Sequence, residues 1–276
     1  MDISAEWLEW DVARAREWLV VPRPGDDKYS RGVLGVFTGS HDYPGAAVLG
    51  VEAAMRTGVG MVRYTGPSSV RQLVLARRPE VVGVGGRVQA WLIGSGMDHA
   101  GRDDQTVALT TVAMAQALPT VLDGGALDLY EGATGPVVIT PHYGELGRVL
   151  EIAKERIADD PARWAVTAAQ QLGVTVLLKG ARTHIVGGGL ALVATSAPSW
   201  LATAGAGDAL AGILGALVAT HSDEAADDPS MLARLAATAS VVHGLAAERA
   251  SRGGPLTVLD LAHEVSGTIA GLLQSS

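Results

Sequence analysis

The sequence contains no cysteine among its 276 residues. This absence excludes disulfides, thiolate nucleophiles, iron–sulfur clusters and zinc sites built on cysteine. Cations are also outnumbered, because 21 Lys and Arg stand against 29 Asp and Glu, which gives a formal net charge of −8. An acidic protein has no long-range attraction to nucleic acid or to an anionic membrane surface, so we expect neither as a partner. Local cations and backbone amides are still able to hold a small anion.

Long apolar runs are missing as well. The longest, Ala209 to Ala219, is about half of the ~20 residues that span a bilayer. The segment from Met1 to Val21 has five acidic side chains and no basic start, so it lacks the pattern of a signal peptide. These features predict a soluble cytoplasmic protein.

Aromatic side chains are rare at 4%, with Phe37 as the single phenylalanine, whereas 35 residues are glycine. Glycine makes up about 7% of an average protein, so its share here is nearly doubled. Ala, Val and Leu must then form the core, for which 48% hydrophobic residues are sufficient. Small core residues and many tight turns are typical of α/β enzymes, in which backbone amides approach a ligand.

Short β-branched or Leu-rich runs alternate along the chain with longer Ala-rich stretches, as in repeated βαβ units. The expected strands are Val33–Phe37, Met61–Thr65, Ala90–Ile93, Thr120–Leu122, Val137–Thr140 and Val174–Leu178. The expected helices between them are Gly45–Thr57, Asp103–Ala117, Tyr143–Glu151 and Asp160–Leu172. The pattern predicts an α/β fold with a doubly wound, mostly parallel central sheet flanked by helices.

The chain changes character after Lys179. Two short strands, Thr183–Val186 and Leu190–Ala194, flank a run of three glycines, which predicts a small antiparallel hairpin. Three helices are expected after it at Asp208–Ala219, Pro229–Ser251 and Val258–Leu273, with the acidic piece Asp223–Asp228 as a solvated loop. No linker or repeat marks a boundary, so we expect a single domain over residues 1–276, in which residues 1–30 form an N-terminal helical extension.

The most informative motif is Thr203-Ala204-Gly205-Ala206-Gly207-Asp208, which leads directly into an apolar helix. Glycines let several N–H groups point at one anion, and the start of a helix adds a partial positive charge. A carboxylate there would repel a phosphate, so Asp208 is better explained as a base for a substrate hydroxyl. The alternative is an ordinary helix cap after a glycine-rich loop.

Two further motifs carry charged side chains after a strand. Lys179 and Arg182 follow a buried strand, where they and Thr183 are placed to bind a phosphate. His142 and Glu145 are three residues apart at the start of a helix, as candidates to orient a substrate, a water or a metal-bound water. The alternatives are a solvated strand end for the first motif and a purely structural hydrogen bond for His142.

Two glycine-containing loops complete the set. The loop Thr38–Ala46 is long for a connection between strand and helix, and long loops tend to carry function. The segment Ile93–Met97 contains another pair of glycines after a strand. Because all five motifs follow strands, a doubly wound sheet brings them to one edge. This convergence favours a common site over unrelated surface loops.

Taken in order, the motifs resemble those of a known family. They are Gly39-Ser40 with Tyr43-Pro44-Gly45-Ala46, Gly94-Ser95-Gly96, Val121-Leu122-Asp123, Thr140-Pro141-His142-Tyr143-Gly144-Glu145, Lys179-Gly180-Ala181 and Gly205-Ala206-Gly207-Asp208. The ordered set resembles the ADP- or ATP-dependent NAD(P)H-hydrate dehydratases of the ribokinase-like superfamily. The resemblance extends from about Arg31 to the C-terminal helices.

The resemblance implies a metabolite-repair reaction. The nucleotide phosphorylates the hydroxyl that water has added to the nicotinamide ring of NADH or NADPH, and loss of phosphate restores the cofactor. Asp208 is then the catalytic residue, and Mg2+ binds the phosphates of ADP or ATP, with Glu145 near the metal through a water. The implied contacts to the hydrate are Ala46, Gly96, His142 and Asp208. The implied contacts to the nucleotide are Lys179, Gly180, Ala181, Arg182, Thr183, Gly205, Ala206 and Gly207.

The resemblance also implies which proteins this one associates or works with. Family members often form homo-oligomers, so we expect one here. Larger members carry an epimerase domain ahead of the dehydratase domain, whereas only about thirty residues precede the first strand in this sequence. We therefore expect the epimerase to be a separate protein.

Three positions depart from the family pattern. Tyr143 stands where proline is usual, Ala206 where threonine is common, and Gly125 where the family has a second aspartate after Asp123. Ala206 is harmless, because related kinases share the sequence GAGD, but loss of the carboxylate at Gly125 is expected to alter substrate contacts or weaken activity. Two other functions therefore stay open, a ribokinase-like kinase of a small vitamin-precursor alcohol and a nucleotide-binding relative without catalysis.

Overall fold

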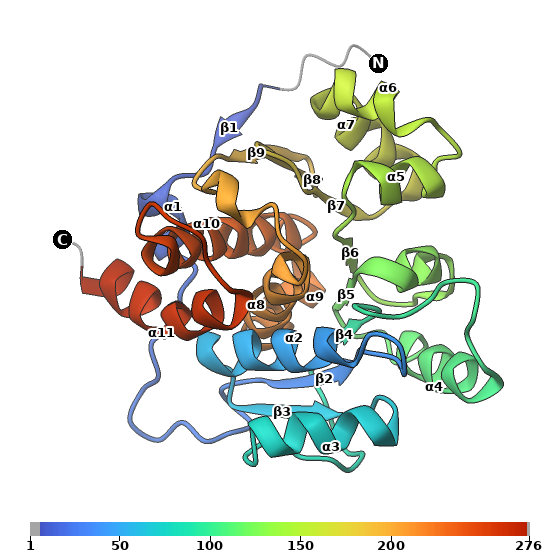
Figure 1. The fold of residues 1–276 in the computed structure, drawn as a ribbon, viewed down its shortest axis with the longest axis vertical. Coiled ribbons are helices and arrows are strands. Elements are labelled where there is room, and N and C mark those ends of the chain that lie inside the picture. Colours follow the sequence, from blue (N-terminus) through green and yellow to red (C-terminus); the bar gives the residue numbers. More distant parts are fainter. Residues whose placement is uncertain (1–5, 275–276) are drawn as a thin grey trace.

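The computed structural model describes residues 6–274, and a nine-stranded sheet runs through them (Figure 1). The strands are β1 (Leu8–Glu9), β2 (Val33–Phe37), β3 (Met61–Tyr64), β4 (Ala90–Ile93), β5 (Thr120–Leu122), β6 (Val137–Ile139), β7 (Thr175–Leu178), β8 (Thr183–Gly187) and β9 (Leu190–Ala194). Their order is β1-β9-β8-β7-β6-β5-β4-β2-β3, and neighbours are parallel except for β7 with β8 and β8 with β9. The predicted mostly parallel sheet with its antiparallel hairpin is confirmed.

Helices cover both faces of this sheet. They are α1 (Val12–Arg16), α2 (Pro44–Thr57), α3 (Ser68–Arg77), α4 (Asp104–Met114), α5 (Tyr143–Val149), α6 (Lys154–Asp159), α7 (Pro161–Leu172), α8 (Ala206–Thr220), α9 (Ser222–Asp227), α10 (Met231–Ser251) and α11 (Val258–Gln274). Two 3-10 helices, η1 (Gly124–Gly132) and η2 (Ser199–Leu201), complete the set. In Figure 1, α4 to α7 lie to the right of the sheet, and α2, α8, α10 and α11 lie to its left.

The two faces of the sheet form two separate cores, because successive side chains of a strand point to opposite sides. Leu34 and Leu92 pack on the side of α8 and α10, whereas Val33 and Ile93 pack on the side of α5 and α7. The strands are therefore buried on both faces, which explains why they are continuous apolar runs without alternation.

The strand order reverses between β2 and β4. From β2 the chain adds β3 on one side, and then it returns to place β4 to β7 in succession on the other side. Ligands of open α/β sheets bind beyond the carboxyl ends of the strands at such a reversal. At the same edge of the sheet the ends of β6 and β7 are joined, because the backbone N–H of Lys179 donates to the carbonyl oxygen of Pro141 at 2.8 Å.

Some predicted elements differ from the observed ones. The acidic piece Asp223–Asp228 was expected to be a loop, but residues 222–227 form helix α9, in which Asp223 and Glu224 occupy the first turn. Negative side chains favour that end of a helix, and Ala225 is buried beneath it. Helix α3 is an addition to the predicted elements, anchored by buried Val70 and Val74 one turn apart.

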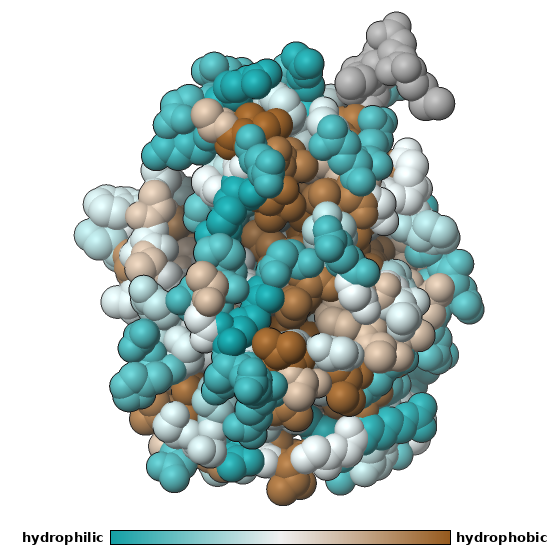
Figure 2. All heavy atoms as spheres, turned by 90° about the vertical axis from the view of Figure 1, so that its right-hand side faces the viewer, coloured by the Kyte–Doolittle hydropathy of each residue, from teal (hydrophilic) through white to brown (hydrophobic). Residues whose placement is uncertain are grey.

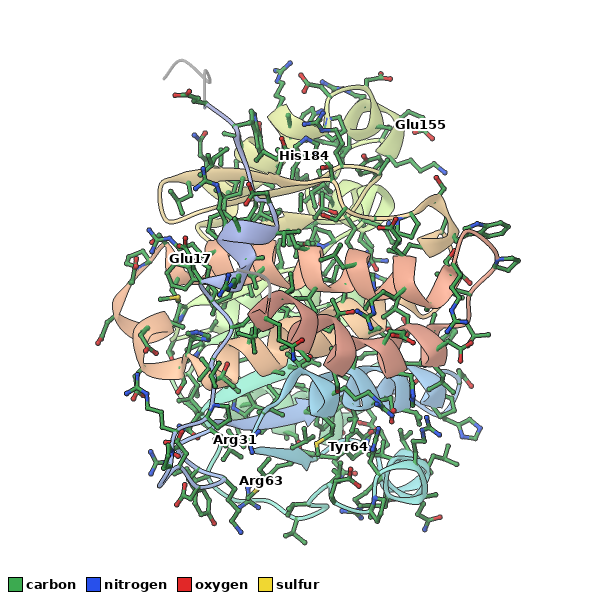
Figure 3. All side chains as sticks on the ribbon, turned by 90° about the vertical axis from the view of Figure 1, so that its left-hand side faces the viewer. Glu17, Arg31, Arg63, Tyr64, Glu155 and His184 are labelled. Carbon is green, nitrogen blue, oxygen red and sulfur yellow. The ribbon has the colours of Figure 1, made fainter. Side chains whose placement is uncertain are left out.

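The N-terminal segment also differs from the expected helical extension. Within its described part it contains strand β1, which pairs with β9 at the edge of the sheet, and the five-residue helix α1. The ring of Trp7 meets that of His184 edge-on, with centroids 4.9 Å apart. Figure 3 shows the segment descending the face from the level of His184 past Glu17 to Arg31.

The opposite face is shown in Figure 2, where hydrophobic residues gather along its middle between hydrophilic ones. On α4, the side chains of Val107, Leu109 and Val112 are exposed. Within residues 6–274 no helix combines the length and apolar character needed to cross a membrane.

Candidate active site

A buried ion pair lies where β5 and β7 end. Asp123 is 3% exposed and accepts hydrogen bonds from the Ser95 hydroxyl at 2.8 Å, the Thr140 hydroxyl at 2.7 Å and the Lys179 ammonium at 3.0 Å. Burial opposes the charge of Asp123, but the ammonium and these hydrogen bonds hold its pKa below the ordinary value. Asp123 is therefore a fixed anion, and its position fixes Lys179.

Lys179 is the cation at the centre of the site. Its Nζ lies 3.5 Å from Oε2 of Glu145, and a Cβ on Gly207 would lie 3.3 Å from the same Nζ. Burial works against the charge, but Asp123, Glu145 and Asp208 hold the pKa of Lys179 above its ordinary value. A charged ammonium is thus placed against the glycine-rich start of α8.

Asp208 lies in the first turn of α8 and has a different environment. Burial and the neighbouring charge of Asp123 raise its pKa to about 7, with Glu145 adding to the effect and Lys179 opposing it. No hydrogen bond or ion pair to its carboxylate occurs within residues 6–274. A carboxylate with a pKa near neutrality and free oxygens is suited to take up and release a proton.

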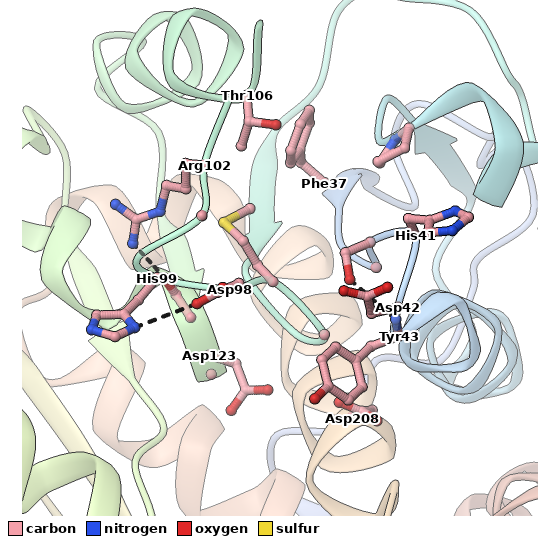
Figure 4. A pocket seen from close by; sticks show the side chains of 18 of the residues that line it. Phe37, His41, Asp42, Tyr43, Asp98, His99, Arg102, Thr106, Asp123 and Asp208 are labelled. Atoms are coloured by element: carbon pink, nitrogen blue, oxygen red, sulfur yellow. Dashed lines mark hydrogen bonds and ion pairs between the residues drawn. The ribbon is translucent and has the colours of Figure 1, made fainter. Parts of the chain in front are cut away.

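Two cavities meet at these residues. The larger, of about 860 Å³, contains Asp123, Glu145 and Asp208 in its wall (Figure 4). The smaller, of about 470 Å³, lies on the side of α10 and the residues after β9. Lys179 and Gly207 line both cavities. A group bound in one cavity is therefore adjacent to a group bound in the other.

The predicted pair His142 and Glu145 is part of the start of α5. The His142 Nδ1 accepts the backbone N–H groups of Gly144 and Glu145 at 3.0 and 3.2 Å, while Glu145 Oε2 accepts the backbone N–H of His142 at 2.8 Å. His142 is thus the cap of the helix, the structural role left open above. Its side chain is 60% exposed, its Nε2 lies 3.6 Å from Oε1 of Glu145, and it lines neither of the two cavities.

Ala46 and Gly96 lie against each other beside the larger cavity. A Cβ on Gly96 would lie 2.5 Å from the Cβ of Ala46 and 2.8 Å from the carbonyl oxygen of Tyr43, so only glycine fits there. Gly96 has a positive φ of 68° and lines the cavity, whereas Ala46 is buried behind it. Gly96 thus forms part of the wall of the larger cavity, and Ala46 supports it from behind.

The predicted nucleotide residues divide into two groups. Gly180, Ala181, Thr183, Ala206 and Gly207 line the smaller cavity together with Lys179, and Gly205 lines the larger one. Arg182 is exposed and lines neither of these two cavities. The structure therefore brings together most of the predicted nucleotide site.

Tyr143 and Gly125 fit local features of this chain. A Cβ on Gly180 would lie 2.3 Å from the Tyr143 hydroxyl oxygen, so the tyrosine packs directly on the turn after β7. At Gly125 a Cβ would lie 2.0 Å from the carbonyl oxygen of Met97, and the Gly125 carbonyl accepts a hydrogen bond from Arg102. The backbone at this position leaves no room for the carboxylate that the family pattern has there.

Carboxylates are the side chains that would hold a divalent cation at this site. The described residues contain no cluster of three metal-ligating side chains, and Glu145 already accepts the His142 N–H. Mg2+ keeps several waters and takes one or two carboxylates together with substrate phosphates. The donor set therefore fits a magnesium ion that the phosphates of a bound nucleotide hold, with Glu145 reaching it through water.

Other residues of the site were not assigned a role from sequence. Ser95 and Thr140 donate hydrogen bonds that position Asp123. The sequence motifs included these two residues but assigned them no function. His243 lines the smaller cavity, and burial lowers its pKa to about 4. It lies within a long apolar helix, so local sequence offers no sign that it meets the cavity.

Fold and site together define an α/β protein with a doubly wound, mostly parallel sheet and a buried acid in the larger of two adjoining cavities. A model of the NAD(P)H-hydrate dehydratase family matches residues 34–270, and the chain belongs to this family. The bifunctional NAD(P)H-hydrate repair enzyme Nnr of Mycobacterium tuberculosis is 40% identical over 232 residues, which are 79% of this chain and 45% of that protein. This chain thus spans about half the length of that relative.

Two other proteins support the family and the fold. The ADP-dependent (S)-NAD(P)H-hydrate dehydratase of Xanthomonas campestris is 34% identical over 227 residues, covering 74% of this chain and 78% of that protein. The crystal structure of the ADP/ATP-dependent NAD(P)H-hydrate dehydratase from Bacillus subtilis, co-crystallized with ATP/Mg2+, superimposes with a TM-score of 0.83 at 23% identity. That alignment covers 98% of this chain and 100% of the other, and it confirms the predicted α/β fold.

Proposed function

We propose that this chain is a nucleotide-dependent (S)-NAD(P)H-hydrate dehydratase that returns the hydrates of NADH and NADPH to the intact cofactors. The observation that carries the proposal is Asp208, whose pKa is about 7 and whose side chain lines the larger cavity next to Gly207, which lines both cavities together with Lys179. The larger cavity takes the hydrate, and the smaller one takes ADP or ATP. Their common wall places the hydroxyl of the hydrate next to the terminal phosphate.

Asp208 acts on the hydroxyl of the hydrated ring. Its ionised carboxylate accepts the hydroxyl proton while the oxygen forms a bond to the terminal phosphorus and the bond to the leaving nucleotide breaks. The C–O bond to the new phosphate group then breaks, and phosphate leaves with the electron pair. Loss of the proton from the adjacent ring carbon restores the double bond, so the sum of the steps is dehydration.

Lys179 and the start of α8 stabilise the transferred group. The ammonium offsets the negative charge that gathers on the phosphate oxygens, and the partial positive charge at the start of α8 adds to this effect. Asp123 positions Lys179 through the 3.0 Å ion pair. Bound Mg2+ would supply further neutralisation of the phosphates, with Glu145 holding one of its waters.

The remaining predicted contacts follow from the same placement. His142 offers its exposed side chain to the hydrate from the cap of α5, and Gly96, supported from behind by Ala46, bounds the ring. In the smaller cavity the phosphates lie toward Lys179, while the apolar side chains of Pro198, Leu201 and Leu210 receive the base.

Cytoplasmic localisation, a homo-oligomer and a separate epimerase stay predictions.

The test follows the absorbance of the reduced nicotinamide. Purified protein, magnesium and NADH hydrate are mixed with ADP in one cuvette and with ATP in another. We expect the absorbance near 340 nm to recover with at least one nucleotide, which also identifies the phosphate donor. Absence of recovery with both, under conditions where the nucleotide binds, would contradict the proposal and favour the kinase of a small alcohol.

A further inference from the structure

Arg148 is a cation in the larger cavity for which the reaction described above has no role. It lies in the last turn of α5, is exposed and lines the cavity. Among the described residues, none forms a hydrogen bond or ion pair with its guanidinium. Its charge is therefore available to a ligand.

The other lysine and arginine of this cavity are already paired. Lys179 is bound to Asp123 at 3.0 Å, and Arg102 is held by the Asp128 carboxylate and the Gly125 carbonyl. The wall of the cavity also contains carboxylates. One of them, Asp103, caps α4 by accepting the Thr106 N–H at 2.7 Å.

The remaining carboxylates make the cavity unfavourable for an anion. Besides Asp123, Asp103, Glu145 and Asp208, its wall includes Asp42 and Asp98. A dinucleotide nevertheless brings a doubly charged pyrophosphate into this space. Without a local cation that group would meet mainly negative charge, and Arg148 is suited to it because a guanidinium binds phosphate oxygens with two parallel N–H donors.

The position of Arg148 along α5 agrees with the dimensions of the substrate. Glu145 and Arg148 are three residues apart, so they project from one side of the helix at a separation of about one turn, roughly 5 Å along its axis. Glu145 lies 3.5 Å from Lys179, where the hydrated ring reacts. One ribose separates the nicotinamide ring from the first phosphate, so that phosphate falls within reach of Arg148.

We propose that Arg148 binds the pyrophosphate of the dinucleotide substrate, on the side of its nicotinamide nucleotide. This inference rests on the proposed function, because it takes the hydrate as the occupant of the larger cavity. Arg148 is then a residue that anchors the substrate, while Asp208 and Lys179 perform the reaction.

The test measures binding of the reaction product, NADH, by its fluorescence, so it needs no turnover. We compare the wild type with Arg148→Gln and Arg148→Lys, and with Arg23→Gln as a control for the loss of an exposed cation outside both cavities. Reduced nicotinamide riboside, which has no phosphate, serves as the second ligand. Hydrogen bonds to charged groups contribute enough for Arg148→Gln to weaken NADH binding about 10- to 100-fold.

The expected pattern separates phosphate binding from a structural effect. Arg148→Gln should leave riboside binding unchanged, Arg148→Lys should restore part of the NADH affinity, and Arg23→Gln should match the wild type. Equal losses for NADH and riboside would overturn the inference, as would unchanged NADH binding or a wild type that binds NADH no better than the riboside. If NADH binding depends on Arg148 while hydrate is not converted, the proposed dehydratase fails and the anchoring role stands.

Discussion

Glu52 and Asp208 are both carboxylates drawn into the interior, but their surroundings are opposite. Glu52 is fully buried between α2 and α3 and accepts hydrogen bonds from Arg56 at 2.7 Å and from Arg78 at 2.6 Å, with Arg77 at 3.2 Å. Burial opposes its charge, but these arginines lower its pKa to about 2. Asp208 has no such partner among residues 6–274, and its pKa is about 7. Burial of a carboxylate thus marks a structural anchor when its oxygens are satisfied, and a chemical group when they are free beside a cavity.

The largest effect is expected from Asp208→Asn. The amide keeps the size of the side chain but accepts no proton, so turnover of the hydrate should fall about 10²- to 10⁴-fold. Nucleotide binding, measured by calorimetry, should stay within a few-fold of the wild type. Asp98→Asn is the matched control, because it removes a carboxylate of the same cavity that is paired with His99 and not with Lys179, and it should cost less than tenfold. A fully active Asp208→Asn would show that its unusual pKa has no part in the reaction.

The next effect concerns Glu52, the carboxylate with the structural role. Glu52→Gln leaves three arginines around a neutral group, and breaking a buried charge network of this kind costs about 3–5 kcal/mol. Urea denaturation should show this loss of unfolding free energy, with little change in KM for the hydrate. Glu80→Gln removes a half-exposed partner of Arg78 at 3.2 Å and should cost at most about 1 kcal/mol. Equal losses in the two variants would refute the anchoring role of Glu52.

The last effect is the dependence of stability on pH. The folded pKa of Asp208, about 7, lies above its ordinary value of 3.8, so the group disfavours the folded state progressively as pH rises between these values and through 7. Asp208→Asn should therefore melt at a higher temperature than the wild type at pH 8, with a difference that shrinks toward pH 5. Thermal melts at several pH values measure this. A difference that is constant across the range would contradict the raised pKa.

Much of this arrangement could be predicted because it is local in sequence. The strands, the GxGD motif and Lys179 at the end of β7 follow from apolar runs, glycine turns and the rule that ligands gather at carboxyl ends of strands. The helix α9 was missed because its short acidic sequence is typical of a loop until Ala225 is seen to pack against the protein.

What could not be predicted depends on distant contacts. The pKa of Asp208 is set by burial and by Asp123, which follows another strand, and the pairing of Arg102 with Asp128 joins the segment before α4 to the 3-10 helix η1. Gly125 illustrates the limit most clearly. Comparison with the family's sequence pattern suggested that a carboxylate is lost at this position. In the structure the backbone of Gly125 lies so close to Met97 that a side chain has no space.

The wall that Lys179 and Gly207 share between the cavities has a kinetic consequence. A phosphoryl group that passes directly from one bound molecule to the other needs no covalent carrier on the protein, and both molecules must be present at the same moment. Initial rates measured at varied concentrations of hydrate and nucleotide should then give intersecting rather than parallel double-reciprocal lines, the signature of a ternary complex.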